Sequence, residues 1–200
     1  MQTRIVDDAG QDVADGTPGE LLVRRAGDDP RFGFFRAYLK DSDATDAAWD
    51  GGWFHTGDIV MRDSDGLFFF RDRKKNIIRR SGENIAALEV ETVLMRHAGV
   101  AALAVGPVPD PLREQEVACL VVPAPGVDAN SLFAELFALA QEELAYFKAP
   151  GWFAAVESLP LTGTQKLQRG ALQSLLHTLF EDGTLVDFRH GKSRRERAAG

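Results

Sequence analysis

The chain has 200 residues and a formal net charge of −7, with 44% hydrophobic and 26% charged residues. This composition is ordinary for a soluble globular protein and excludes collagen-like and low-complexity classes, while the negative charge argues against a general nucleic-acid binder. No apolar run reaches the roughly 20 residues that a membrane span needs, and the N-terminus lacks the apolar core of a signal peptide. The single cysteine, Cys119, excludes a disulfide framework, so we expect a reducing, cytoplasmic setting.

The N-terminal part of the chain has the pattern of β-strands. TRIVDDAGQDV predicts two short strands around a turn at 7–10, and ELLVRR predicts a further strand. The segment 27–52 is rich in Gly, Asp and small polar residues, which indicates an irregular excursion. Two strands are expected in DIVMRDSDGLFFFRDR, because an Asp-Gly turn between apolar runs is a strong hairpin signal.

From about residue 76 onward, strand and helix patterns alternate. Apolar side chains recur at helical spacing in three segments, and two apolar runs have the character of buried strands. The expected elements are, in order, a short strand in NIIRRSGENI, a helix over 87–98, strands in VAALAVG and EVACLVVP, a helix from Asn130, a strand in WFAAVESLP and a helix over 172–180.

This change of pattern predicts two units and an α+β fold class. We expect a small β subdomain over 1–72, followed by a compact α+β domain over 76–190 with its own core. Residues 191–200, GKSRRERAAG, are expected to form a flexible basic tail.

GWFHTGD places Asp58 at a turn ahead of a strand, where Gly57 lets the backbone bend. A carboxylate held in this way can accept hydrogen bonds from two vicinal hydroxyls, such as those of a ribose. The alternative interpretation is an ordinary turn aspartate, since Asp and Gly are common in turns.

The segment 71–80 carries six basic residues and one acidic residue, Asp72, and leads into a Ser-Gly-Glu-Asn turn. Such cations can bind phosphates through charge-assisted hydrogen bonds. A solvated, charged hairpin explains the same pattern.

Two further segments carry candidate ligand-binding side chains. In LPLTGTQKLQR, Lys166 follows a stretch rich in Thr and Gly, and a lysine on such a loop can bring a point charge to a developing anion. In AYFKAP, the ring of Phe147 could stack on a purine. Taken alone, an ordinary surface lysine and a packing role for the aromatic ring are the simpler interpretations.

Taken together and in order, these segments resemble the C-terminal part of the AMP-forming acyl-CoA synthetases, in the adenylate-forming superfamily. The resemblance rests on GELLVR, GWFHTGD, DGLFFFRDRKKNIIRRSGENI, the Glu89-Val90-Glu91 helix start, FKAP and LPLTGTQKLQR. It extends over about residues 3–175, and the details of the 79–84 turn are most similar to carnitine- and crotonobetaine-type ligases.

The resemblance implies a two-step reaction in which a carboxylic acid and ATP with Mg²⁺ give an acyl-adenylate, and CoA then displaces AMP. The C-terminal domain of such enzymes rotates between the two steps. Carried over by motif, Lys166 is the adenylation lysine, Asp58 and Arg73 bind the nucleotide, and Lys75 is the hinge residue. The CoA-binding residues implied by the resemblance are Arg80, Ser81, Gly82, Glu83 and Phe147.

Several features depart from the family pattern. Ala87 stands where a proline is usual, Arg113-Glu114 replace a common Trp-Gly, and Ala149 replaces a frequent basic residue. The phosphate-binding loop, the acyl pocket and the rest of the large N-terminal domain are absent from the sequence, so we expect an incomplete synthetase that is inactive alone. The alternatives are a non-catalytic module that binds CoA or a protein, and a fragment of a peptide-synthetase adenylation domain.

Overall fold

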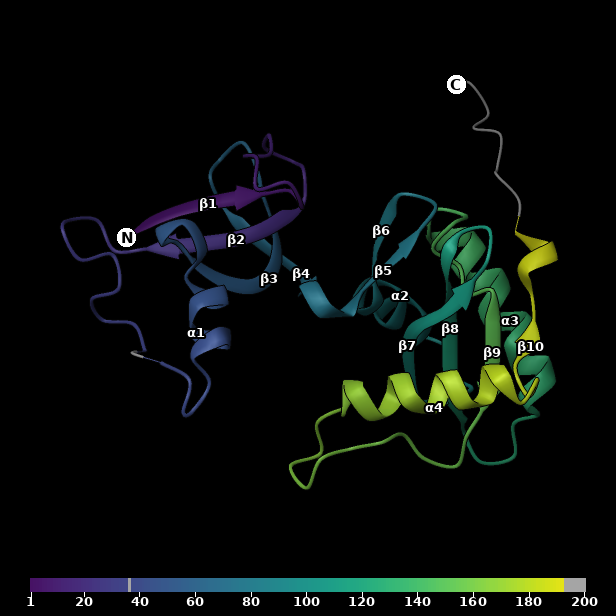
Figure 1. Ribbon diagram of the computed structural model, residues 1–200. Helices are drawn as coiled ribbons and strands as arrows, with labels where there is room; N and C mark the ends of the chain where they lie inside the picture. The colour runs from purple at the N-terminus through teal and green to yellow at the C-terminus, as the bar shows by residue number, and fades with distance from the viewer. Residues whose placement is uncertain (36, 193–200) are drawn as a thin grey trace, which may run out of the picture. The chain divides into compact units, whose positions relative to one another are not determined.

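A computed structural model describes residues 1–35 and 37–192, and the chain divides into two compact units, Met1–Lys75 and Asn76–Gly200 (Figure 1). Most of the basic tail expected over 191–200 lies outside the described residues.

Unit 1 contains one antiparallel sheet with the strand order β1-β2-β3-β4. Its strands are β1 (Gln2–Val6), β2 (Gly19–Arg24), β3 (Phe54–Arg62) and β4 (Phe68–Arg73). The hairpin expected around the Asp-Gly turn is confirmed, and the Asp63 carboxylate holds this turn by accepting hydrogen bonds from the backbone N–H groups of Asp65 and Leu67, both at 2.9 Å. The second strand expected in TRIVDDAGQDV is reduced to an isolated bridge between Val6 and Asp12.

The excursion of unit 1 is less irregular than the sequence indicates. It contains the helix α1 (Ser42–Ala48), which is followed by the single 3₁₀ turn η1 (Asp50–Gly52). Asp41 caps α1, because its carboxylate accepts the backbone N–H of Ala44 at 2.9 Å. The helix is only 7 residues long, which is too short for an apolar period to show in the sequence.

Unit 2 is built on a mixed sheet with the order β10-β9-β8-β5-β6, in which β7 also pairs with β8. β8 and β9 run parallel, and the other neighbours are antiparallel. The strands are β5 (Ile77–Arg80), β6 (Glu83–Ala86), β7 (Val100–Asp110), β8 (Glu114–Pro123), β9 (Trp152–Ala155) and β10 (Val186–Asp187). The helices are α2 (Ala87–Leu94), α3 (Ala129–Glu143) and α4 (Arg169–Glu181), and the 3₁₀ turns are η2 (Lys74–Asn76), at the junction of the units, and η3 (Arg189–Gly191).

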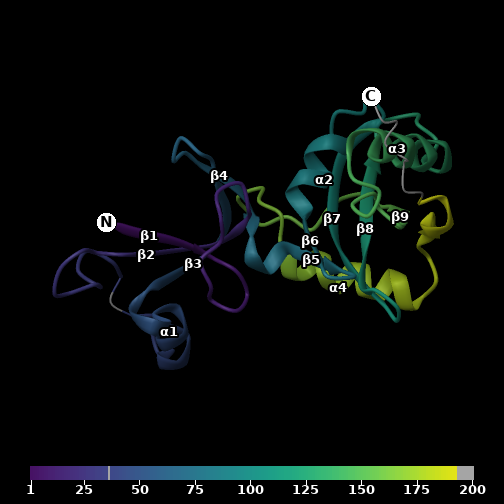
Figure 2. The same ribbon diagram turned by 90° about the horizontal axis from the view of Figure 1, so that it is seen from above.

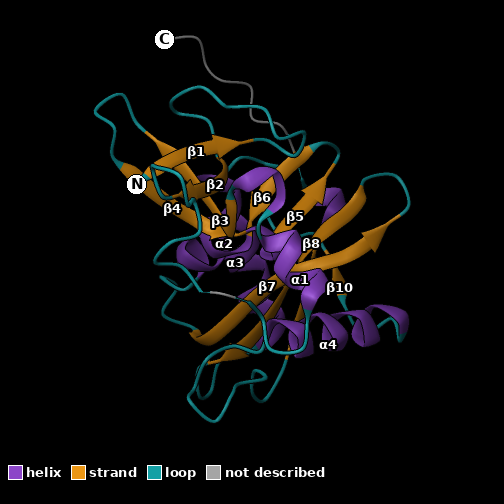
Figure 3. Ribbon diagram, turned by 60° about the vertical axis from the view of Figure 1, so that its left-hand side comes forward, coloured by secondary structure: helices purple, strands orange, loops and turns teal. Residues whose placement is uncertain are grey.

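Helices cover both faces of this sheet (Figure 2). Along β8, Val117, Cys119 and Val121 point into a core shared with α2 and α3, whereas Ala118 and Leu120 point into a second core under α4. α4 packs mainly along β7 (Figure 3). The mixture of helices and sheets confirms the α+β class expected from the sequence.

A substitution of Phe153 tests the larger core, which is shared with α2 and α3. The ring of Phe153 is fully buried, stacks on Phe133 with 5.5 Å between the ring centres, and meets the ring of Phe188 edge-on. Phe153→Ala should lower the free energy of unfolding of unit 2 by about 3–5 kcal/mol, because it leaves a cavity. Amide hydrogen exchange in β8 and β9 measures this loss. Leu112→Ala, at a side chain that is 85% exposed, is the control, and unchanged protection in Phe153→Ala would contradict the assignment.

Candidate functional site

Asp58 and Arg73 form a pair across the hairpin of unit 1. They are direct partners in the β3–β4 ladder, and Arg73 Nη1 donates a hydrogen bond to Asp58 Oδ1 and another to the carbonyl of Thr56, at 2.9 Å. The two side chains are 32% and 51% exposed. The pair therefore offers a carboxylate and a guanidinium side by side at a surface that solvent and ligands can reach.

The backbone of β3 just before Asp58 is held by hydrogen bonds of Thr56. The Thr56 hydroxyl donates to the carbonyl of Leu21 at 2.7 Å and accepts the backbone N–H of Asp58 at 3.1 Å. Gly57 has a φ of 68°, a left-handed conformation that side chains disfavour. Asp58 therefore lies inside β3 and not, as the sequence predicts, at a turn ahead of the strand, whereas the positive φ of Gly57 agrees with the expected bend of the backbone.

Lys75 is the last residue of unit 1 and is exposed within η2, at the junction of the two units. Its neighbour Lys74 has a partner inside unit 1, since its ammonium donates to Glu20 Oε2 at 2.7 Å. Burial raises the pKa of Glu20, but Lys74 and His55 outweigh it and hold that pKa below its usual range.

Lys166 lies in a short hairpin, residues 160–168, which we call the lysine hairpin. A bridge between Leu161 and Leu167 closes it, and the backbone N–H of Thr162 donates to the carbonyl of Lys166 at 2.8 Å. The Thr162 hydroxyl accepts the Lys166 N–H at 3.1 Å. The Lys166 side chain is exposed and its ammonium has no partner among the described residues, so it is available to an anionic ligand.

Ser81 and Gly82 form the two-residue turn between β5 and β6. Both have positive φ, 51° and 81°, as hairpin turns of the primed types require. The Ser81 N–H donates to the carbonyl of Arg113 at 3.0 Å, and the turn is exposed together with Glu83. With no Cβ at Gly82, an extended ligand can approach the backbone closely here.

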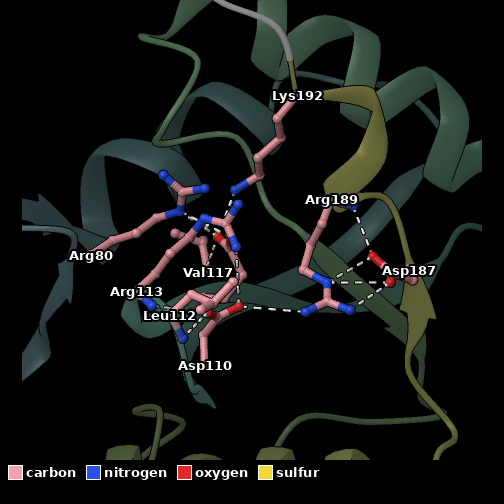
Figure 4. Close-up of polar contacts among 9 residues, drawn as sticks. Arg80, Asp110, Leu112, Arg113, Val117, Asp187, Arg189 and Lys192 are labelled. Atoms are coloured by element: carbon pink, nitrogen blue, oxygen red, sulfur yellow. Dashed lines mark hydrogen bonds and ion pairs between the residues drawn. The ribbon is translucent and has the colours of Figure 1, made fainter.

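Arg80, which precedes this turn, is placed differently from the other candidate CoA residues (Figure 4). It is 6% exposed, and its Nε donates to both carboxylate oxygens of the fully buried Glu116, at 3.0 and 2.9 Å. Lys192 donates to the same carboxylate at 2.6 Å. The structure therefore gives Arg80 a role in neutralising Glu116 and holding the base of the turn.

A second group of charges lies beside Glu116. The Asp110 carboxylate accepts the backbone N–H groups of Leu112 and Arg113 at 3.0 and 2.9 Å and pairs with the guanidinium of Arg189, which also binds Asp187 (Figure 4). Burial raises the pKa of Asp110, but these N–H groups and cations together hold it below its usual range. The two groups tie the C-terminal segment 187–192 to the ends of β7 and β8.

Phe147 is half-buried and packs against the core under α2 and α3, with the ring of Tyr146 edge-on at 5.7 Å. Its neighbour Lys148 donates to both oxygens of Glu89 at 2.7 and 2.8 Å. The Phe147 ring is thus partly a core side chain, and the Lys148 ammonium lies 6.0 Å from its centre.

Sequence reasoning missed the buried acids of unit 2, Glu91 and Glu116, and their partners Arg169 and Lys192. The sequence signal is weak, because Glu116 directly precedes the apolar run VACLVV, and Glu91 shares LEVETVL with two other polar residues, Glu89 and Thr92. Such an acid requires a cation nearby, but the identity of that cation depends on contacts distant in sequence.

Within the described residues, no group of three or more His, Cys, Asp or Glu side chains could hold a metal ion. The same part of the chain contains no helix with the length and apolar character of a membrane span.

Comparison with known proteins identifies relatives over most of the chain. Residues 89–166 match the family model described as the AMP-binding enzyme C-terminal domain. The crotonobetaine/carnitine–CoA ligase of Proteus mirabilis is 34% identical over 174 residues, which cover 86% of this chain and 32% of that protein. The chain thus spans about a third of the length of the curated relatives it matches.

Two solved structures share the fold. The o-succinylbenzoate CoA synthetase of Bacillus subtilis, in complex with an acyl-adenylate intermediate, has a TM-score of 0.73 and 30% identity over 86% of this chain and 33% of its own. An amide bond synthetase from Marinactinospora thermotolerans has a TM-score of 0.72 and 32% identity over 87% of this chain and 34% of its own.

Lys192 gives a test of the charge cluster through its pH dependence. Burial lowers the pKa of Lys192 to about 8, although Glu116 opposes this effect. The ordinary lysine pKa is about 10.4, so between about pH 8 and that value the unfolded chain binds more protons than the folded chain. Raising the pH through this window should therefore increase the free energy of unfolding, by about 3 kcal/mol.

Lys192→Met removes this titration, so the free energy of unfolding of the parent chain should rise relative to the variant on going from pH 7.5 to pH 10. Urea unfolding followed by circular dichroism gives the two values. Lys40→Met, at an exposed lysine outside the cluster, supplies the baseline. A constant difference between parent and Lys192→Met across this range would show that burial does not lower the pKa of Lys192.

Proposed function

Because the chain belongs to the family of AMP-forming acyl-CoA synthetases and corresponds to their C-terminal part, we propose that it supplies the adenylation lysine and the CoA-facing surface of an ATP-dependent acid–thiol ligase. The ligase joins a carboxylic acid to CoA and releases AMP and pyrophosphate. The N-terminal domain with the phosphate loop and the acyl pocket completes the enzyme. A cytoplasmic location, expected from the cysteine usage, belongs to the same proposal.

The observation that carries this proposal is the exposed ammonium of Lys166 on the hydrogen-bonded lysine hairpin. In the first half-reaction the carboxylate of the acid attacks the α-phosphorus of ATP, and negative charge develops on the phosphate oxygens as pyrophosphate leaves. A lysine is a compact point charge that stabilises such oxygens. A charge that already had a carboxylate partner would be less available for this work.

Asp58 and Arg73 would hold the nucleotide in this scheme. The carboxylate of Asp58 can accept hydrogen bonds from the two ribose hydroxyls, while Arg73 holds this carboxylate in place and can itself reach a ribose or phosphate oxygen. Mg²⁺ would enter with ATP, held chiefly by phosphate oxygens, as is usual for this ion.

The exposed turn Ser81-Gly82 with Glu83 would line the path of the pantetheine arm, and Phe147 would lie near the adenine of CoA. In the second half-reaction the CoA thiol attacks the acyl carbonyl and AMP leaves. Arg80 would act here through the turn, because its guanidinium is buried against Glu116. Lys75 would be the hinge about which unit 2 turns between the two half-reactions.

The thiol acceptor is the preferred choice over an amine, because the named curated relatives are CoA ligases. The similarity to an amide bond synthetase makes an amine acceptor the second candidate. Supplying the acyl-adenylate with CoA or with an amine distinguishes the two, since only the true acceptor accelerates AMP release.

The chain by itself should not release pyrophosphate from ATP in the presence of carboxylic acids, because it lacks the groups that hold the triphosphate and the acid. A chimera that joins it to the N-terminal part of the Proteus mirabilis ligase should regain acid-dependent pyrophosphate release. An inert but folded chimera would argue for a non-catalytic binding module instead. Release by the isolated chain would show that it holds the triphosphate and the acid by itself.

Lys166→Ala in this chimera should slow the adenylation half-reaction by about 10²–10³-fold, the usual cost of losing one electrostatic contact to the transition state. Thioester formation from a supplied acyl-adenylate should change little. Single-turnover kinetics measures each half-reaction separately. Gln165→Asn changes the neighbouring side chain and keeps a residue that tolerates its left-handed backbone, with φ at 60°, so it is the matched control. Equal losses in both half-reactions would refute the assignment.

A further inference from the structure

The Glu91 carboxylate on α2 is held by three donors from two other elements. Arg169, the first residue of α4, donates from Nη1 to Oε1 and from Nη2 to Oε2, both at 2.8 Å. The backbone N–H of Val105 on β7 donates to Oε1 at 2.9 Å. The side chains of Glu91 and Arg169 are 11% and 24% exposed, so this two-pronged pair is largely withdrawn from water.

The same pair also completes the hydrogen bonding of β7. While the Glu91 carboxylate accepts the N–H of Val105, Arg169 Nη1 donates to the carbonyl of this residue at 2.9 Å. Val105 is fully buried, so both backbone groups need partners. The pair thus takes the place of a neighbouring strand at this position, and it links α2 on one face of the sheet to the start of α4 on the other.

The start of α4 is also the end of the lysine hairpin. Lys166 lies three residues before Arg169, and Gln168 connects the two ends of the hairpin, with its N–H on the carbonyl of Pro160 at 2.8 Å and its side chain on the carbonyl of Leu161 at 2.7 Å. Gln168 makes no side-chain capping bond to α4. The contact between Arg169 and Glu91 is thus the polar anchor of this helix start, beside the apolar packing of Leu159, Leu167 and Leu172 in the core under α4.

We propose that Glu91 and Arg169 are positioning residues that hold Lys166 where the adenylation half-reaction needs it. This inference rests on the proposed function of Lys166. The pair touches no reacting atom: it fixes the C-terminal end of the lysine hairpin against β7 and α2, so that the exposed ammonium is presented from a rigid base. A misplacement of about 1 Å at such a charge can cost about 10²-fold in rate.

Glu91→Gln tests the anchor with the least change of shape. All three partners of the carboxylate are donors, so the amide NH₂ of glutamine would face a donor in either orientation. In the 200-residue chain, amide exchange within 162–168 should become faster by about tenfold or more, while exchange in β8 stays unchanged. Glu89→Gln, which removes the partner of Lys148 from the same helix, is the matched control and should leave the lysine hairpin protected.

Kinetics in the active chimera then tests positioning. Glu91→Gln should slow adenylation by about 10-fold to 10²-fold, with unchanged KM for ATP and with thioester formation spared. Combined with Lys166→Ala, it should cause no further loss, because a residue that acts only through Lys166 has nothing left to act on. Arg169→Lys keeps the charge but loses the two-pronged geometry, so it should slow adenylation in the same way but to a smaller extent. This variant provides the test if Glu91→Gln fails to fold.

The outcomes separate this inference from the proposed function. If Lys166→Ala slows adenylation but Glu91→Gln and Arg169→Lys leave both hairpin exchange and adenylation unchanged, the anchor is refuted and the function stands. If the losses of Glu91→Gln and Lys166→Ala multiply, the pair acts on general stability and positioning is refuted. If Lys166→Ala has no effect on adenylation, the proposed function fails, and with it the kinetic role, even where faster exchange shows a structural anchor.

Discussion

The burial of β8 on both faces is the constraint that shapes unit 2. Residues 117–121 of this strand are all fully buried, with alternate side chains in the cores under α2 and α3 and under α4. A strand with helices on both sides cannot carry charged groups along its middle, so polar chemistry is confined to strand ends and the loops that follow them. The Ser81-Gly82 turn follows the end of β5, and the lysine hairpin precedes the first residue of α4.

Two buried carboxylates then determine how these ends are held. Glu116, at the start of β8, is neutralised by Arg80 and Lys192 and so joins β5 to the C-terminal segment. Glu91 is neutralised by Arg169 and joins α2 to the start of α4. A buried ion pair adds little net stability over an apolar contact, but removal of one partner leaves a buried charge and costs about 3–5 kcal/mol. The two carboxylates therefore specify an arrangement of the chain more than they stabilise it.

The sequence was sufficient for those features that depend on local patterns. The Asp-Gly hairpin of unit 1, the backbone bend at Gly57, and most helices and strands of unit 2 follow from periodicity and turn chemistry, whereas the short strands β6 and β10 were not expected. The helix α1 was missed because its cap, Asp41, lies in a stretch rich in acidic and small residues, which has no apolar periodicity that would indicate a helix. Arg169 is 78 residues from its partner Glu91, and Lys192 is 76 residues from its partner Glu116. No local sequence pattern encodes such distant pairings.

The difference between local patterns and distant contacts also explains why the sequence predicts Arg80 to be a ligand-binding residue. It belongs to a run of cations next to an exposed turn, and a run of cations predicts a surface that meets anions. In a strand, however, successive side chains point to opposite faces, so neighbouring cations have different environments. Arg79 is exposed, whereas Arg80 is buried and finds the carboxylate of Glu116.

The hinge that we propose at Lys75 lies at the junction between the two units. Lys74 is fixed within unit 1 by Glu20, and Ile77 is fixed within unit 2 by its ladder with Ala86. Lys75 thus lies between residues held by different units, and a change of its backbone dihedrals would leave both sets of contacts intact. The Asp58–Arg73 pair and the lysine hairpin are each braced inside their own unit. A rotation at Lys75 would therefore carry Lys166 and the Ser81-Gly82 turn as one body, without dismantling either the proposed nucleotide site or the anchor of the lysine.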